Sequence, residues 1–91
     1  MTFPEPRTLE AWWRAVDGNW NDLEAIVEKY ASNLIEQLDR AHERCDGMAI
    51  VRIFNAAWFA APDDPSIRDM PGWLLLCDLC SEADVLELHL G

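Results

Sequence analysis

Four side chains with metal-binding chemistry occur in two short pairs. His42 and Cys45 are three positions apart, and Cys77 and Cys80 have the same spacing. One imidazole and three thiols form a ligand set that a tetrahedral structural zinc site accepts, and helices would place each pair on one face. Three leucines directly precede Cys77, however, and this favours cysteines that are small core residues. We therefore expect no cofactor and keep zinc as the alternative.

Other catalytic chemistry has little support in the chain. A reactive thiol needs a nearby cation or a helix N-terminus, whereas Asp78 and Glu82 are the charges closest to the Cys77 and Cys80 pair. The chain contains no Gly-x-Ser-x-Gly, His-Glu-x-x-His or glycine-rich phosphate loop. Asp63 and Asp64 lie beside prolines, where aspartate usually forms turns. The sequence predicts that the protein is not an enzyme.

The charge balance is strongly acidic. Seventeen Asp and Glu residues outnumber seven Lys and Arg residues, so the net charge is -10 at pH 7. Such a chain repels phosphate backbones, which argues against direct binding of nucleic acid. It is attracted to basic surfaces, and these commonly belong to nucleic-acid-binding proteins. The expected partner is therefore a basic protein.

Two groups of acids have few basic neighbours in sequence, and two of the five tryptophans stand at the ends of expected elements. In the middle of the chain Arg40 is spaced to pair with Glu36 and Glu43, which would neutralise that stretch. Trp12 and Trp58 are expected in the core, whereas an indole at an element end is a good interface anchor. We predict that the following residues contact the partner: Asp17, Trp20, Asp22, Glu24, Glu28, Trp73, Asp78, Glu82, Asp84 and Glu87.

Helical periodicity positions the first half of these residues. Thr8 can cap a helix whose apolar stripe contains both Trp12 and Trp13. Asn21 and Glu24 are spaced as a capping box and predict a second, long helix that runs to about Cys45 and ends at Asp46–Gly47. The acids of this helix fall outside its apolar face.

The second half contains an apolar segment, a loop and a final helix. Residues 48–61 are apolar nearly all round and predict a central helix, although their β-branched residues leave a strand at 49–54 as an alternative. Three prolines in 62–72 predict a loop with a short helical turn after Asp64–Pro65, and Pro71–Gly72 can begin a last helix. We expect an all-α compact bundle of about four helices, or an α+β fold if 49–54 and 85–90 form strands.

Size limits the organisation of the chain. Ninety-one residues support a single domain, 1–91, with one core. The N-terminus lacks the pattern of a signal peptide, no segment has the length of a membrane span, and the cysteine count is odd. We therefore expect a cytoplasmic protein with reduced cysteines and no membrane association.

Three functional hypotheses follow. The leading one is a non-enzymatic inhibitor that occupies the basic, nucleic-acid-binding surface of a partner protein, as small acidic anti-restriction, anti-CRISPR and nuclease-immunity proteins do. The second is a homo-oligomeric assembly protein, with a homodimer formed by tryptophan-rich helix faces. The third is a small domain stabilised by zinc. Binding to a basic partner should weaken steeply with ionic strength, whereas a hydrophobic homodimer should not.

Overall fold

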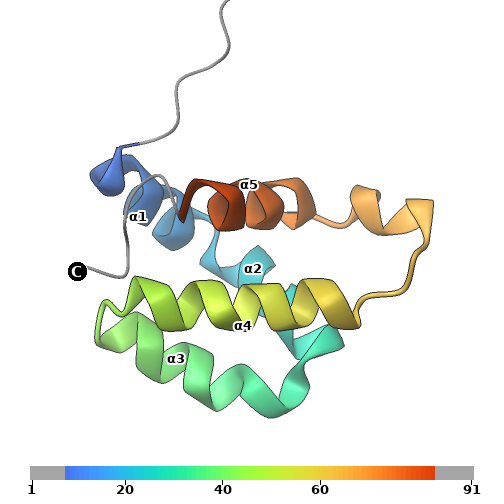
Figure 1. Ribbon diagram of the computed structural model, residues 1–91, viewed down its shortest axis with the longest axis horizontal. Coiled ribbons are helices and arrows are strands. Elements are labelled where there is room, and N and C mark those ends of the chain that lie inside the picture. Colours follow the sequence, from blue (N-terminus) through green and yellow to red (C-terminus); the bar gives the residue numbers. More distant parts are fainter. Residues whose placement is uncertain (1–7, 84–91) are drawn as a thin grey trace, which may run out of the picture.

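Helices account for nearly all of the regular structure in the computed structural model, which describes residues 8–83 (Figure 1). The α-helices are α1 (Leu9–Gly18), α2 (Trp20–Tyr30), α3 (Ile35–Glu43), α4 (Gly47–Ala60) and α5 (Trp73–Ala83), with short 3-10 helices at Ser32–Leu34 and Pro65–Asp69. Within the described residues there is no strand. The all-α prediction is confirmed, and the strand alternative for 49–54 is wrong because these residues lie in α4. Residues 85–90 lie outside the described residues.

Helix α1 begins where the sequence predicted. The Thr8 side chain accepts a hydrogen bond from the Ala11 amide at 3.2 Å, which satisfies one of the free amides of the first turn. Trp12 is fully buried, and its Nε1 donates to the Leu79 carbonyl of α5 at 3.1 Å. This bond fixes α1 against α5, so the core prediction for Trp12 is confirmed.

The predicted long helix from Asn21 to about Cys45 is wrong. The helix ends at Tyr30, Ala31 adopts a non-helical conformation, and α3 begins only at Ile35. Serine and asparagine at positions 32 and 33 compete with helical hydrogen bonding, so the break falls where helix propensity is weak. Both α2 and α3 pack their apolar faces against α4. A single straight helix over the same residues could not place both faces against α4.

The predicted capping box is also wrong. Helix α2 begins at Trp20 after Asn19, whose side chain makes no capping hydrogen bond. Glu24 does not reach back to the Asn21 amide but accepts a hydrogen bond from the Trp20 indole at 3.1 Å. The helix instead begins directly after Asn19, which joins it to α1, and Trp20 and Glu24 lie on the same face of α2.

Helix α4 is the central helix of the fold, as predicted. The Asp46 side chain caps it by accepting from the Ala49 amide, and Cys45 enters the preceding turn with a left-handed φ of 54°. Helices α2, α3 and α5 all pack on α4, and Phe54 is completely buried among them. Figure 1 shows α4 between α3 and α5.

The connection from α4 to α5 follows the sequence prediction. Asp64 accepts a hydrogen bond from the Ser66 amide at 2.9 Å and starts the short helix Pro65–Asp69. Gly72 has a φ of 81°, and a Cβ atom added there would lie 3.0 Å from the Asp22 Cβ. Only glycine allows α5 to begin so close to α2.

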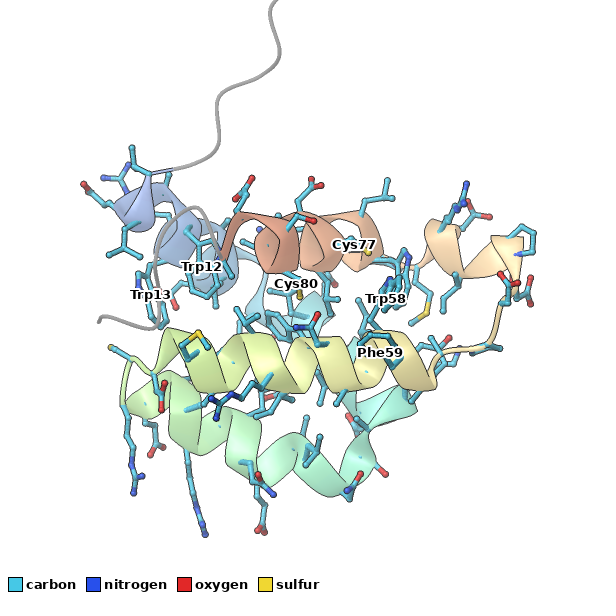
Figure 2. All side chains as sticks on the ribbon, viewed as in Figure 1. Trp12, Trp13, Trp58, Phe59, Cys77 and Cys80 are labelled. Atoms are coloured by element: carbon cyan, nitrogen blue, oxygen red, sulfur yellow. The ribbon has the colours of Figure 1, made fainter. Side chains whose placement is uncertain are left out.

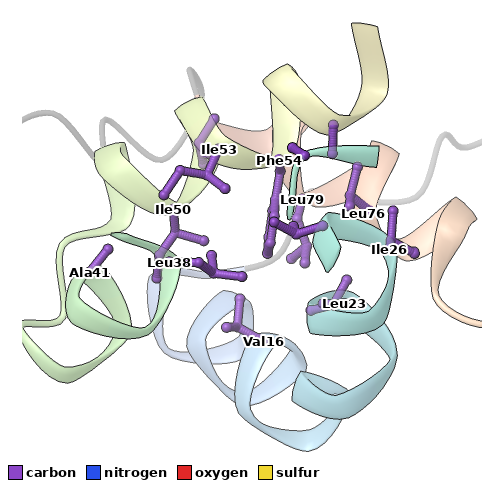
Figure 3. Packing of buried hydrophobic residues seen from close by; sticks show 14 of the residues in the cluster. Val16, Leu23, Ile26, Leu38, Ala41, Ile50, Ile53, Phe54, Leu76 and Leu79 are labelled. Atoms are coloured by element: carbon purple, nitrogen blue, oxygen red, sulfur yellow. The ribbon is translucent and has the colours of Figure 1, made fainter. Parts of the chain in front are cut away.

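One hydrophobic core joins all five α-helices (Figure 3). Each helix contributes side chains to the core, and on each helix they are spaced so that they lie on one face. The larger members that are fully buried are Trp12, Val16, Leu23, Ile26, Val27, Leu38, Ile50, Phe54, Leu76 and Leu79.

Candidate functional site

Three helices bring acidic and aromatic side chains together where α1 meets α2. The Trp20 indole stacks on the His42 imidazole of α3, with ring centroids 3.9 Å apart and planes inclined by 15°. His42 Nε2 lies 2.7 Å from an Asp17 carboxylate oxygen of α1, and Trp20 Nε1 donates to Glu24. The Trp20 ring is therefore held on one face by an imidazole and at its polar edge by a carboxylate.

A second carboxylate reinforces the negative charge of this group. The pKa of Glu24 is raised, mainly because its carboxyl group hydrogen-bonds with that of Asp39 on α3, and further by burial and by the charge of Asp39. The indole of Trp20 acts in the opposite direction, and Glu28 one turn later raises the pKa again. Carboxyl groups that interact in this way repel each other when both are ionised, which favours the neutral form of Glu24.

These contacts involve four of the five predicted residues between positions 17 and 28, and Asp22 is the exception. Trp20, Glu24 and Glu28 repeat every four residues on one face of α2, while Asp22 is exposed near the start of α5. A hollow of about 270 Å³ at the α1–α2 junction is lined by residues that include Asp17, Trp20 and Asp22. We call the group the acidic surface, made of Asp17, Trp20, Asp22, Glu24, Glu28 and Asp39.

The predicted residues of α5 are placed differently. Asp78 is exposed and Glu82 is half-buried, whereas Trp73 retains only 7% of its accessible surface. The Trp73 ring packs against Tyr30 of α2 at a centroid distance of 6.4 Å, so its expected exposure at the helix end is wrong. Asp84 and Glu87 lie outside the described residues.

The zinc ligand set does not come together. His42 contacts Asp17 and Trp20, and Cys45 is exposed in the α3–α4 turn. Between residues 8 and 83 no three His, Cys, Asp or Glu side chains are grouped as metal ligands. The other two predicted ligands, Cys77 and Cys80, line a hollow between α4 and α5.

The thiols of Cys77 and Cys80 are poorly suited to reaction. Burial raises the pKa of Cys77, and the charge of Asp78 adds to the effect. Burial also raises the pKa of Cys80 to about 12, with a further contribution from Cys77. Both groups are therefore protonated at neutral pH, which disfavours nucleophilic or redox chemistry.

Sequence reasoning missed a second exposed region. Trp58 and Phe59 at the end of α4 are 46% and 77% exposed, and Leu74 on α5 is 64% exposed. The prediction that Trp58 belongs to the core is wrong, because α4 extends beyond the helices that cover its other residues. We call this group, Trp58, Phe59 and Leu74, the apolar face. The all-round apolar character of residues 48–61 was the available signal, since α4 has more apolar surface than its neighbours cover.

The aromatic pair of the apolar face lies beside the cysteines. Trp58 and Phe59 pack edge to face with centroids 4.9 Å apart. Figure 2 shows them on α4, with Cys77 and Cys80 on the adjacent α5. The hollow between the two helices is about 480 Å³ and is lined by Asn55, Trp58, Phe59, Cys77, Cys80 and Ser81.

The expected ion pairs of Arg40 are not formed. In the described part of the chain Arg40 makes no ion pair with Glu36 or Glu43, whereas Glu10 pairs with Arg14 and Asp17 with His42. Arg40 instead lines a hollow of about 350 Å³ with Arg44 and Arg52 between α3 and α4. Three of the seven Lys and Arg residues therefore line one hollow between α3 and α4.

None of the described helices has both the length and the apolar character needed to cross a membrane. Comparison of the chain with protein-family models, with curated proteins and with solved structures found no match.

Proposed function

We propose that this chain is a non-enzymatic protein-binding domain whose acidic surface occupies a basic, nucleic-acid-binding surface of a partner protein. The observation that carries the proposal is the Trp20 group, in which an indole stacked on His42 is bordered by the carboxylates of Asp17, Glu24 and Asp39. Tryptophan is among the residues that most often dominate binding energy, and the surrounding carboxylates suit a partner rich in Arg and Lys.

The rigidity of the group supports binding. Its side chains come from α1, α2 and α3, and hydrogen bonds or ring stacking hold them in place before any partner arrives. A prearranged surface loses less side-chain freedom on association. In a chain of net charge -10, acids held close together repel one another and lower the stability of the fold. A role in binding would account for keeping them together.

Inhibition is the consequence we propose for such binding. A partner that uses Arg and Lys to hold phosphates would find carboxylates at the acidic surface, and the two ligands would compete for one basic site. Long-range attraction would accelerate the encounter, and the Trp20 contact would lengthen the lifetime of the complex. The proposal implies a cytoplasmic setting, where basic nucleic-acid-binding proteins are found.

The first experiment is capture of partners from cells of the source organism at low salt, followed by elution with a salt gradient and mass spectrometry. We expect a basic nucleic-acid-binding protein that elutes at moderate salt and is displaced by DNA or RNA. Recovery of the bait alone, or of partners that DNA and RNA never displace, would contradict the proposal.

Paired charge reversals then test the location of the interface. The test variant is Asp22→Lys with Glu28→Lys, and the matched control is Glu36→Lys with Glu43→Lys on α3. All four positions are exposed, and Asp22 and Glu36 both occupy the first turn of a helix. We expect the test variant to lose capture by at least about tenfold while the control keeps most of it. Equal losses would show that net charge alone acts.

A further inference from the structure

The apolar face has more exposed aromatic surface than a small monomer needs. Phe59 is the most exposed large apolar side chain of the described residues. Trp58 packs against it on α4, and Leu74 is exposed on α5, which packs against α4. Single exposed apolar residues are ordinary, but a contiguous group of them marks an interaction site. Its composition, aromatic and nearly uncharged, differs from that of the acidic surface and indicates a different occupant.

The shape of this region would allow two copies of it to fit together. Trp58 and Phe59 line the hollow between α4 and α5, which Cys77 and Cys80 also line. Trp58 and Phe59 also line a second hollow of about 460 Å³, together with Asp63, Asp64 and Arg68. A projecting aromatic pair between two hollows can be inserted into a copy of the same surface.

Charges of opposite sign lie at the two ends of this region. Arg52 is exposed on α4, about 9 Å before Trp58 along the helix. Asp63 and Asp64 follow the end of α4 at Ala60, are exposed, and line the second hollow together with Trp58 and Phe59. Phe59 lies seven residues beyond Arg52, about 10 Å along the helix, and so on the same side of α4. Two antiparallel copies related by a two-fold axis near Trp58 would therefore bring each Arg52 to the Asp63–Asp64 turn of the other copy.

We propose that the occupant of the apolar face is a second copy of this chain, arranged antiparallel about a two-fold axis near Trp58 and Phe59. Each Phe59 enters the hollow between α4 and α5 of the other copy, and each Arg52 faces the other's Asp63 and Asp64. The homodimer does not depend on the proposed function, because no residue of the acidic surface belongs to this face. It presents two acidic surfaces to one partner or to two.

The principal test is molar mass as a function of concentration, by sedimentation or light scattering. We expect the wild-type chain to dimerise and Phe59→Asp to remain monomeric. The matched control is Leu9→Asp, which changes a leucine of 45% exposure outside the apolar face and should leave the dimer intact. Thermal unfolding of both variants checks that each is folded, and Leu74→Asp provides a second disruption of the same face. A wild-type monomer at every concentration overturns the proposal, and so does a dimer that survives both disruptions.

Charge exchange tests the antiparallel arrangement. Arg52→Glu and Asp63→Arg should each weaken the dimer a few-fold, about the effect of one exposed ion pair, and the double variant should recover the lost affinity. Asp64 is left unchanged because it caps the Pro65–Asp69 helix. If the double variant is no tighter than either single variant, this pairing is wrong.

Salt separates the dimer from the proposed function. Added salt screens the repulsion between two chains of net charge -10, so the dimer should be retained or strengthened at salt concentrations that release a basic partner. Phe59→Asp should still capture that partner, and Asp22→Lys with Glu28→Lys should still dimerise. Loss of both properties in either variant would contradict the separation of the two surfaces.

Discussion

The acidic surface and the apolar face hold their aromatic rings in opposite ways, since Trp20 is half-buried whereas Phe59 is mostly exposed. Trp20 is framed by charged and polar partners from three helices, whereas Trp58 and Phe59 contact each other and project from the end of one helix. The first arrangement holds its ring before binding and excludes a second acidic copy by repulsion. The second has few charges to repel a copy. The surroundings of a surface ring therefore indicate its partner better than the ring itself does.

The largest expected effect concerns the residue that connects both regions. Trp12 packs in the core and donates to the Leu79 carbonyl, which ties α1 of the acidic surface to α5 of the apolar face. Trp12→Ala should lower the free energy of unfolding by about 3–5 kcal/mol. Urea unfolding measures the loss, and both partner capture and dimerisation should fall with it. A loss below about 1 kcal/mol would contradict the described packing.

Replacing one tryptophan in each region distinguishes the two functions. Trp20→Ala should weaken partner binding by about 30-fold, the effect of a hot-spot residue, and leave the dimer unchanged. Trp58→Ala should have the reverse effect, and each variant serves as the control for the other. Titration calorimetry and sedimentation provide the two measurements. If both variants weaken the same association, the two surfaces act as one.

Alkylation of Cys77 and Cys80 reports on the apolar face, and Cys45 provides a reference elsewhere in the fold. Cys45 is exposed and should react first, whereas Cys80 should react slowest at neutral pH because its pKa is raised to about 12. Its rate should rise as the pH increases toward that value, since only the thiolate reacts. In Phe59→Asp the reaction of Cys77 should accelerate several-fold, because no second copy covers the hollow. Mass spectrometry of each cysteine over time provides the rates, and equal rates for Cys77 in both proteins would argue against coverage.

The smallest effect concerns the protonation of the acidic surface. The raised pKa of Glu24 means that folding favours its neutral form, so ionised Glu24 destabilises the fold above this pKa. The penalty disappears as the pH falls through the folded pKa toward the unfolded value of 4.5. Glu24→Gln should therefore be more stable than the wild type at pH 7, by a few tenths of a kcal/mol because the group is well solvated, and the difference should vanish near pH 4.5. Unfolding at both pH values tests this, and a stability difference independent of pH would exclude the carboxyl pair as its cause.

Local signals predicted much of the fold. Thr8, Asp64 and Gly72 mark element boundaries through caps and turn geometry that involve a few neighbouring residues, and these boundaries are confirmed. The break at Ala31 was missed because the apolar period continues across it from Tyr30 to Leu34. The break lets both α2 and α3 pack on α4. The apolar period of one segment carries no information about packing on another helix.

The candidate site was predicted in part. The acids and the tryptophan between positions 17 and 28 form one surface, although the contributions of His42 and Asp39 come from α3 and had no signal in their own sequence context. Trp73 and Trp58 were assigned the wrong way round. Both stand near the end of a helix, so local sequence does not distinguish which ring a neighbouring helix covers.

The acidic charge, the helical class and the helix boundaries at Thr8, Asp46–Gly47 and Gly72 follow from the sequence alone, because they depend on composition and on contacts within a few residues. Helix packing is needed to bury Trp73 while Trp58 stays exposed, to bring Asp17, Trp20 and His42 together, and to leave the end of α4 projecting beyond its neighbours. Burial and exposure are set by helices far apart in the chain. The exposure of a side chain therefore depends on how those helices pack, and the sequence of a single segment does not specify that packing.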